Sequence, residues 1–105
     1  MSQVIRGVLL EEQERLKRLL KRYSAELDVL PRGSVRQKVI KGKEYAYLVY
    51  REGKKVINEY LGSAERKDVQ KIMSDAVRAK KIKDGYKDVQ HSLKDLERML
   101  RGRTV

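Results

Sequence analysis

The chain has 105 residues, enough for one domain, and is 40% hydrophobic and 39% charged, with no Phe and no Trp. The absence of Cys excludes disulfides, thiolate metal sites and a Cys nucleophile, and with no apparent signal peptide or membrane span it favours a cytoplasmic location. The net charge of +11, from 26 Lys and Arg against 15 Asp and Glu, is typical of proteins with a polyanionic partner, although a solubilising surface has the same composition.

The first segment, residues 2–30, has the pattern of a long helix. Apolar side chains recur at heptad spacing, at Leu9, Leu16, Leu20, Tyr23, Leu27 and Leu30. Pro31 and Gly33 follow directly and are expected to end the helix. This stripe predicts that the helix packs against a second helix.

The next segment has the period of a sheet. Short alternating runs, separated by Gly42 and Gly53, predict three antiparallel strands in a meander, over residues 34–40, 43–51 and 54–61. We expect two-residue turns at Lys41-Gly42 and Glu52-Gly53. These turns would pair Ile40 with Lys43 and Arg51 with Lys54, and would place Tyr60 opposite Tyr45.

Residues 63–102 again have helical periodicity, and Ser63 is a candidate N-cap. Apolar positions follow three- and four-residue steps as far as Leu100, with one slip at Ile82. Gly85 lies inside this segment, and Gly costs about 1 kcal/mol relative to Ala within a helix. Both one long helix and two helices with a break near Gly85 are compatible with the pattern.

The predicted fold class is therefore α+β, in a single domain over residues 1–105. An antiparallel, coiled-coil-like helix pair would carry the three-stranded sheet at one end. In this arrangement the second helix extends beyond the first, so its apolar tail at Leu93, Leu96 and Leu100 lacks a full partner. We therefore expect a homodimer formed through the helices.

The predicted strand pairing separates two faces of the sheet. One face, with Val35, Val39, Ala46, Leu48, Tyr50, Ile57 and Leu61, suits packing on the helices. The other mixes cations with phenol rings, which suits nucleic acid because Lys and Arg bind phosphate while Tyr stacks on bases. Asn58 could read a base edge. The candidate nucleic-acid-binding residues are Arg36, Lys38, Lys43, Tyr45, Tyr47, Arg51, Lys54, Asn58 and Tyr60.

A second basic cluster comprises Arg78, Lys80, Lys81 and Lys83 in the second helix. It could follow a phosphate backbone beside the sheet. A solvated helix face is the somewhat better interpretation, because Asp75 and Asp84 interrupt the positive charge.

No residue pattern predicts a catalytic site, a metal site or a cofactor. His91 is the only His and has no Cys or second His to share a metal with. The carboxylates mostly lie three or four residues from a cation, as expected for pairs on helix surfaces. We therefore expect a protein that is not an enzyme and does not bind membranes.

Residues 41–62, Lys-Gly-Lys-x-Tyr-x-Tyr-Leu-x-Tyr-Arg-x-Gly-x-Lys-Val-x-x-x-Tyr-Leu-Gly, resemble a hairpin in small prokaryotic and phage proteins. The string is also similar to a stretch near the N-terminus of some insertion-sequence transposases, and it covers about a fifth of the chain. The transposase resemblance implies DNA binding, but the acidic catalytic triad of those enzymes has no counterpart here.

Two functions remain as expectations. The first is a non-catalytic nucleic-acid-binding protein, with DNA favoured over RNA, that uses the Tyr-rich face of the sheet on a dimerising stem. The alternative is a coiled-coil interaction or scaffold protein whose positive charge only keeps it in solution.

Overall fold

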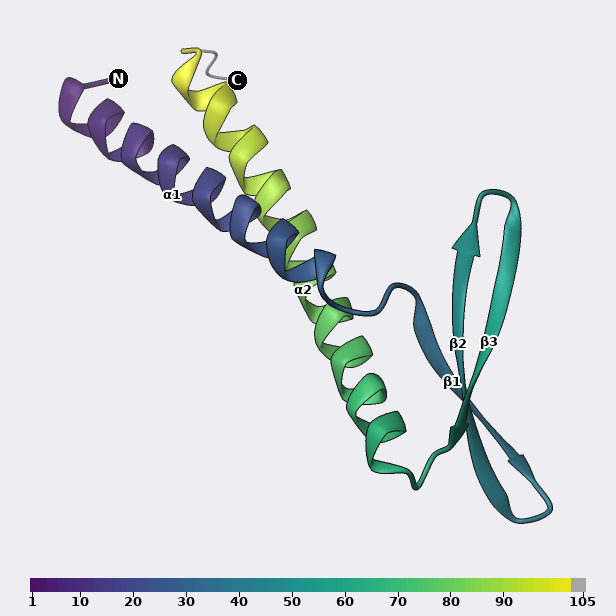
Figure 1. The fold of residues 1–105 in the computed structure, drawn as a ribbon. Helices are drawn as coiled ribbons and strands as arrows, with labels where there is room; N and C mark the ends of the chain where they lie inside the picture. Colours follow the sequence, from purple (N-terminus) through teal and green to yellow (C-terminus); the bar gives the residue numbers. More distant parts are fainter. Residues whose placement is uncertain (103–105) are drawn as a thin grey trace. The chain divides into compact units, whose positions relative to one another are not determined.

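The computed structural model describes residues 1–102 and confirms the predicted order of one long helix, three antiparallel strands and a second long helix (Figure 1). The elements are α1 (Gln3–Asp28), β1 (Ser34–Ile40), β2 (Lys43–Glu52), β3 (Lys55–Ser63) and α2 (Lys67–Leu100). Contacts divide the chain into two compact units. The helical unit contains α1 and α2 from Ile82 onward, and the sheet unit spans Val29–Lys81. Whether the chain behaves as a single domain stays a prediction.

In the helical unit, α1 and the second half of α2 lie side by side and antiparallel, with the N-terminus and the end of α2 together (Figure 1). Ser2 caps α1, because its hydroxyl accepts a hydrogen bond from the Ile5 amide at 3.2 Å. At the same end, the Arg6 guanidinium donates to the Leu100 carbonyl at 3.0 Å. The heptad stripe provides the contact between the helices, and Leu16 and Leu96 are both only 6% exposed.

The burial of Leu96 corrects one expectation. The apolar tail of α2 does not lack a partner, since α1 lies along it. The prediction assumed that the helices start level at the sheet, whereas α1 pairs with the half of α2 that begins at Ile82. A homodimer would therefore need a different surface.

Helix α2 is continuous through Gly85, so the alternative with two helices is wrong. The ring of Tyr23 on α1 lies against Gly85 and covers its backbone. The helix starts at Lys67, later than predicted, because Ser63 is the last residue of β3 and pairs with Tyr45. Within residues 1–102, no helix is long and apolar enough to cross a membrane.

The sheet has the strand order β1-β2-β3. The first hairpin matches the prediction, with Ile40 opposite Lys43, and its turn residues Lys41 and Gly42 both have positive φ, at 52° and 79°. The second hairpin differs, because its turn is formed by Gly53 and Lys54 rather than by Glu52 and Gly53.

Glycine explains this difference. Gly53 is the first residue of the two-residue turn and has a φ of 61°, a conformation that favours glycine. The sequence prediction placed Gly53 at the second turn position, the position that Gly42 occupies in the first hairpin. Arg51 consequently pairs with Val56 instead of Lys54, a register shift of two residues. Because side chains alternate with a period of two, an even shift leaves the residues that remain in the strands on their predicted faces, and only Lys54 leaves its face, for the turn. A bulge opposite Ala46 and Tyr47 leaves Leu61 unpaired.

One face of the sheet packs in the interior of the sheet unit, as predicted. Ala46 on β2 is fully buried and Val69 on α2 is 1% exposed, and Val69 lies close to Gly62. Small residues such as Ala64 and Ala76 complete this core, which explains how the unit forms without Phe or Trp. Val39 is the exception on this face, because it lies near the hairpin end and is 67% exposed.

Candidate nucleic-acid interface

The strand register collects eight of the nine candidate residues on one face of the sheet, here called the tyrosine face. Arg36 lies opposite Tyr47, and Lys38 lies opposite Tyr45. Directly opposed residues of antiparallel strands project to the same side, so the pairings link the face across all three strands. Its members are Arg36 and Lys38 on β1, Lys43, Tyr45, Tyr47 and Arg51 on β2, and Asn58 and Tyr60 on β3.

Three phenol rings form a cluster on this face. Tyr47 lies opposite Tyr60, with ring centroids 5.3 Å apart and planes inclined at 55°. Tyr45 lies 6.3 Å from Tyr60 at 43°. Such tilted arrangements are the preferred geometry of aromatic pairs. The Tyr60 ring therefore touches both neighbours, although the pairing predicted from the sequence placed it opposite Tyr45 alone.

A cation is part of this cluster. The ammonium nitrogen of Lys38 lies 5.1 Å from the centroid of the Tyr47 ring, within the range of a cation–π interaction. On the opposite face, Arg32 makes a similar contact with Tyr50 at 4.4 Å. Positive charge is thus held against an aromatic ring on the tyrosine face, where a phosphate could reach it.

The carboxylates of the strands all lie on the other face. Glu44 is opposite Val39, Glu52 is opposite Lys55, and Glu59 is opposite Leu48. Four strand cations (Arg36, Lys38, Lys43 and Arg51) project from the tyrosine face, whose strand positions carry no acidic residue. The net charge of the whole segment, in which these three glutamates offset part of the Lys and Arg charge, hides this separation. Each glutamate lies an odd number of residues from the tyrosine-face tyrosines of its own strand, and this spacing in the sequence already indicates that the glutamates project from the opposite face.

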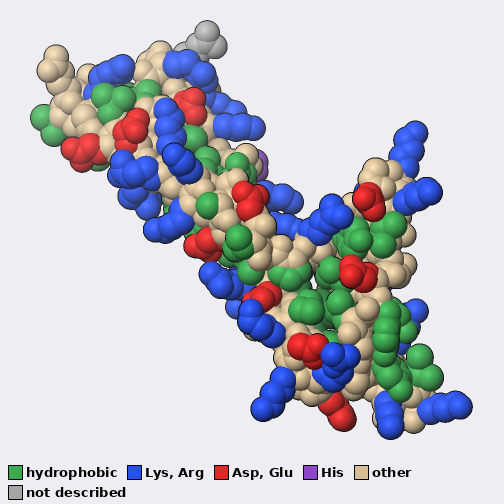
Figure 2. Space-filling view, viewed as in Figure 1, with side chains coloured by type: hydrophobic (Ala, Val, Ile, Leu, Met, Phe, Trp, Pro, Cys, Tyr) green, Lys and Arg blue, Asp and Glu red, His purple; other side chains and the backbone are tan. Residues whose placement is uncertain are grey.

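These four cations are exposed and free of ion pairs. Among residues 1–102, no carboxylate lies within ion-pair distance of Arg36, Lys38, Lys43 or Arg51. Ion pairs shown elsewhere in the structure include Glu12–Arg15 on α1 and Asp95–Arg98 on α2. Figure 2 shows Lys and Arg side chains (blue) gathered at both hairpin ends of the sheet unit.

Lys54 is the one candidate that the structure removes from the tyrosine face. It lies in the Gly53-Lys54 turn, so it belongs to a hairpin end and not to a strand face. Lys55 follows it and pairs with Glu52 on the opposite face. The misplaced turn is the cause of this error.

The second basic cluster does not form a single patch. Arg78 and Lys81 are three residues apart on α2, as are Lys80 and Lys83. At about 100° per residue, these two pairs lie on different sides of the helix. All four side chains are exposed, and they do not present one continuous surface to a phosphate backbone.

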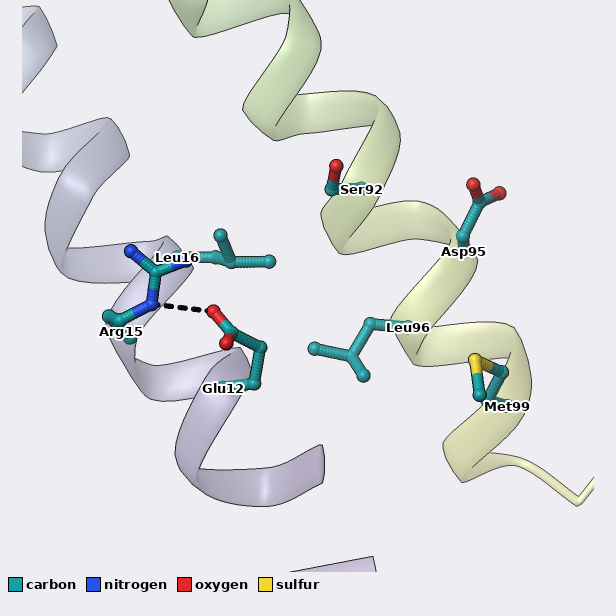
Figure 3. A pocket seen from close by; sticks show the side chains of 7 residues that line it. All are labelled: Glu12, Arg15, Leu16, Ser92, Asp95, Leu96 and Met99. Carbon is teal, nitrogen blue, oxygen red and sulfur yellow. Dashed lines mark hydrogen bonds and ion pairs between the residues drawn. The ribbon is translucent and has the colours of Figure 1, made fainter. Parts of the chain in front are cut away.

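A groove in the helical unit is a weaker candidate for a functional site than the tyrosine face. It has a volume of about 360 Å³ and is lined by Glu12, Arg15, Leu16, Ser92, Asp95, Leu96 and Met99. In Figure 3, Leu16 and Leu96 point toward one another between the helices, and Arg15 contacts Glu12 at 2.6 Å. Nowhere in residues 1–102 do three His, Asp or Glu side chains gather as a metal ion would require. His91 is exposed on α2.

Comparison with known proteins identifies a family but no activity. A family model described as a domain of unknown function (DUF6788) matches residues 9–71, which include most of α1, the whole sheet and the start of α2. No curated protein and no solved structure matches the chain. The match covers every residue of the tyrosine face.

Proposed function

We propose that this chain, which belongs to the DUF6788 family, is a non-catalytic nucleic-acid-binding protein that uses its tyrosine face, with DNA as the favoured partner and the cytoplasm as its location. The observation that carries the proposal is the separation of charge on the sheet. All four cations of the tyrosine face are exposed and unpaired, and all three strand carboxylates project from the opposite face.

Electrostatics supports this partner. A surface with four unpaired cations and no carboxylate attracts a polyanion, and each phosphate that it neutralises releases counterions. The three tyrosines add flat apolar rings between the cations, a combination typical of surfaces that bind nucleic acids. DNA is favoured because residues 41–62 resemble a segment of DNA transposases.

No reaction is included in the proposal. The carboxylates of Asp68 and Asp95 are 62% and 72% exposed and lie in ion pairs with neighbouring arginines. General acid–base chemistry needs carboxylates held beside a substrate in a shielded site, and these surface pairs are better suited to solubility.

Binding measured as a function of salt concentration tests the proposal. A variant with Arg36→Gln, Lys38→Gln and Arg51→Gln is compared by fluorescence anisotropy with a control, Arg18→Gln, Lys21→Gln and Arg22→Gln, which removes the same charge from exposed positions of α1. We expect the sheet variant to bind more weakly and to lower the slope of log affinity against log salt by about 2 to 3, since each phosphate contributes roughly 0.7–0.9. Equal loss in both variants would contradict a role for the tyrosine face.

A scaffold protein is the second candidate function, and the first turns of α1 favour it. Val4, Ile5 and Val8 are 79%, 54% and 59% exposed, so α1 presents apolar side chains that the described residues do not cover. We propose that these residues, rather than the heptad stripe, also form the expected homodimer. If no nucleic acid binds at low salt, the scaffold function becomes the better assignment.

A further inference from the structure

We propose that the tyrosine face selects single-stranded DNA over duplex DNA, because the exposed ring of Tyr60 stacks on an unpaired base. This inference rests on the proposed function and specifies its substrate. Tyr60 is 58% exposed, the most open of the three rings, yet it contacts both Tyr45 and Tyr47.

The two neighbouring rings hold Tyr60 in place. Both are half-buried, lie on the central strand and meet Tyr60 at tilted angles of 43° and 55°. Side chains held by their neighbours lose less conformational entropy on binding than freely rotating ones. Tyr60 is thus an exposed aromatic surface whose ordering is largely complete before a ligand arrives.

An exposed ring of this kind suits unpaired bases. In a duplex, each base is stacked between its neighbours and presents only its edges in the grooves, where hydrogen-bonding side chains read the sequence. Besides the four cations, which can bind phosphates as well as base edges, the strand positions of the tyrosine face provide one amide, Asn58, for such contacts, against three phenol rings. Unpaired bases expose their flat faces, and single-strand-binding proteins stack them on aromatic side chains.

The cations are placed to hold the adjoining phosphates. Arg36 and Lys38 lie on β1, and Tyr60 lies on β3, two strands away. With strands about 4.8 Å apart, this separation is roughly 10 Å. A single strand crossing the sheet could stack a base on β3 and place its backbone over β1, where Lys38 is already held near Tyr47.

The test compares three ligands of one sequence by fluorescence anisotropy: a 12-nucleotide DNA strand, its duplex and the equivalent RNA strand. Wild-type protein is expected to bind the DNA strand at least about tenfold more tightly than the duplex. The Tyr60→Ala variant should weaken binding to the single strand by about 5- to 150-fold, the range found for one stacked base, and leave duplex binding nearly unchanged. Tyr60→Phe keeps the ring and should bind within about twofold of wild type.

Two further measurements test whether the effect is specific to the Tyr60 ring. Val56→Ala shortens another exposed side chain of the same face, 56% exposed, and should leave binding unchanged. The chain has six Tyr and no Trp, so intrinsic fluorescence reports on tyrosine directly. The DNA strand should quench this emission, and the quench should shrink in Tyr60→Phe although its affinity is retained.

The outcomes distinguish this inference from the function on which it rests. Equal or tighter binding of the duplex would overturn single-strand selection while leaving nucleic-acid binding intact. Tighter binding of the RNA strand would overturn the assignment to DNA. A Tyr60→Ala variant that binds the DNA strand as well as wild type would exclude stacking on this ring. If none of the three ligands binds at low salt, both proposals fail.

Discussion

The ring of Tyr23 on α1 lies over Gly85 on α2, so that a Cβ atom at Gly85 would be 3.5 Å from Cε2 of the ring. This distance is an ordinary van der Waals contact, and the glycine lies inside a continuous helix. Gly85→Ala should therefore raise the free energy of unfolding by about 1 kcal/mol, through helix propensity. We expect a rise in melting temperature of roughly 4–8 °C, measured by circular dichroism.

Gly7→Ala is the matched control for this change, because it replaces a glycine of α1 with no neighbouring atom within 4 Å of the new Cβ. It should give a similar rise from propensity alone. A lower melting temperature for Gly85→Ala, together with a higher one for Gly7→Ala, would show that Tyr23 requires the glycine.

Gly33, between α1 and the sheet, should not tolerate a side chain. Its φ is 84°, and a Cβ would clash with the Val49 carbonyl oxygen. Gly42 has a similar φ of 79° but open space around it. Gly42→Ala should cost about 1–3 kcal/mol from backbone strain, and Gly33→Ala should cost clearly more because the strand must also move. Urea unfolding of both variants measures the two losses of unfolding free energy. Equal losses would contradict the prediction.

Leu16 and Leu96 should stabilise the helical unit together. Each is 6% exposed, and the two side chains face one another between α1 and α2 (Figure 3). Replacing either with Ala should lower the free energy of unfolding by about 2–4 kcal/mol. The double variant should lose less than the sum, because residues that line a shared cavity are coupled. Additive losses in urea unfolding would show that the two leucines act independently.

The second basic cluster should contribute less to binding than the tyrosine face. Lys80, Lys81 and Lys83 are exposed but lie on different sides of α2. Changing all three to Gln should lower DNA affinity less than the variant with Arg36→Gln, Lys38→Gln and Arg51→Gln, which removes the same charge. Anisotropy titrations of both variants at the same salt concentration make the comparison. A larger loss of affinity in the α2 variant would indicate that the interface lies on the helix.

The exposed apolar side chains at the start of α1 should form the dimer contact. Val4 and Val8 are 79% and 59% exposed and lie one turn apart, so replacing both with Ser should weaken self-association without harming the core. Sedimentation velocity over a range of concentrations measures the effect. Val77→Ser, at a position 58% exposed on α2, is the control and should leave the dimer intact. A monomer in the wild type would contradict the prediction.

Much of the candidate interface could be predicted because strand side chains alternate. Tyr45, Tyr47 and Arg51 are separated by even numbers of residues, so any regular strand through them places all three on one face. The error in the second turn moved the register by two residues and therefore changed the partners but not the faces. The exception is Lys54, which the prediction placed in a strand and the structure places in the turn.

By itself, the sequence determined the element order, the heptad stripe of α1 and the faces of the strands, because these depend on periodicities within single segments. Only the tertiary structure decided which segments meet. Tyr23 covers Gly85 within one continuous helix, α1 covers the tail of α2 at Leu96, and Tyr60 contacts two rings at once. These relationships join residues that are distant in the chain. Periodicity within one segment contains no information about the distances between segments.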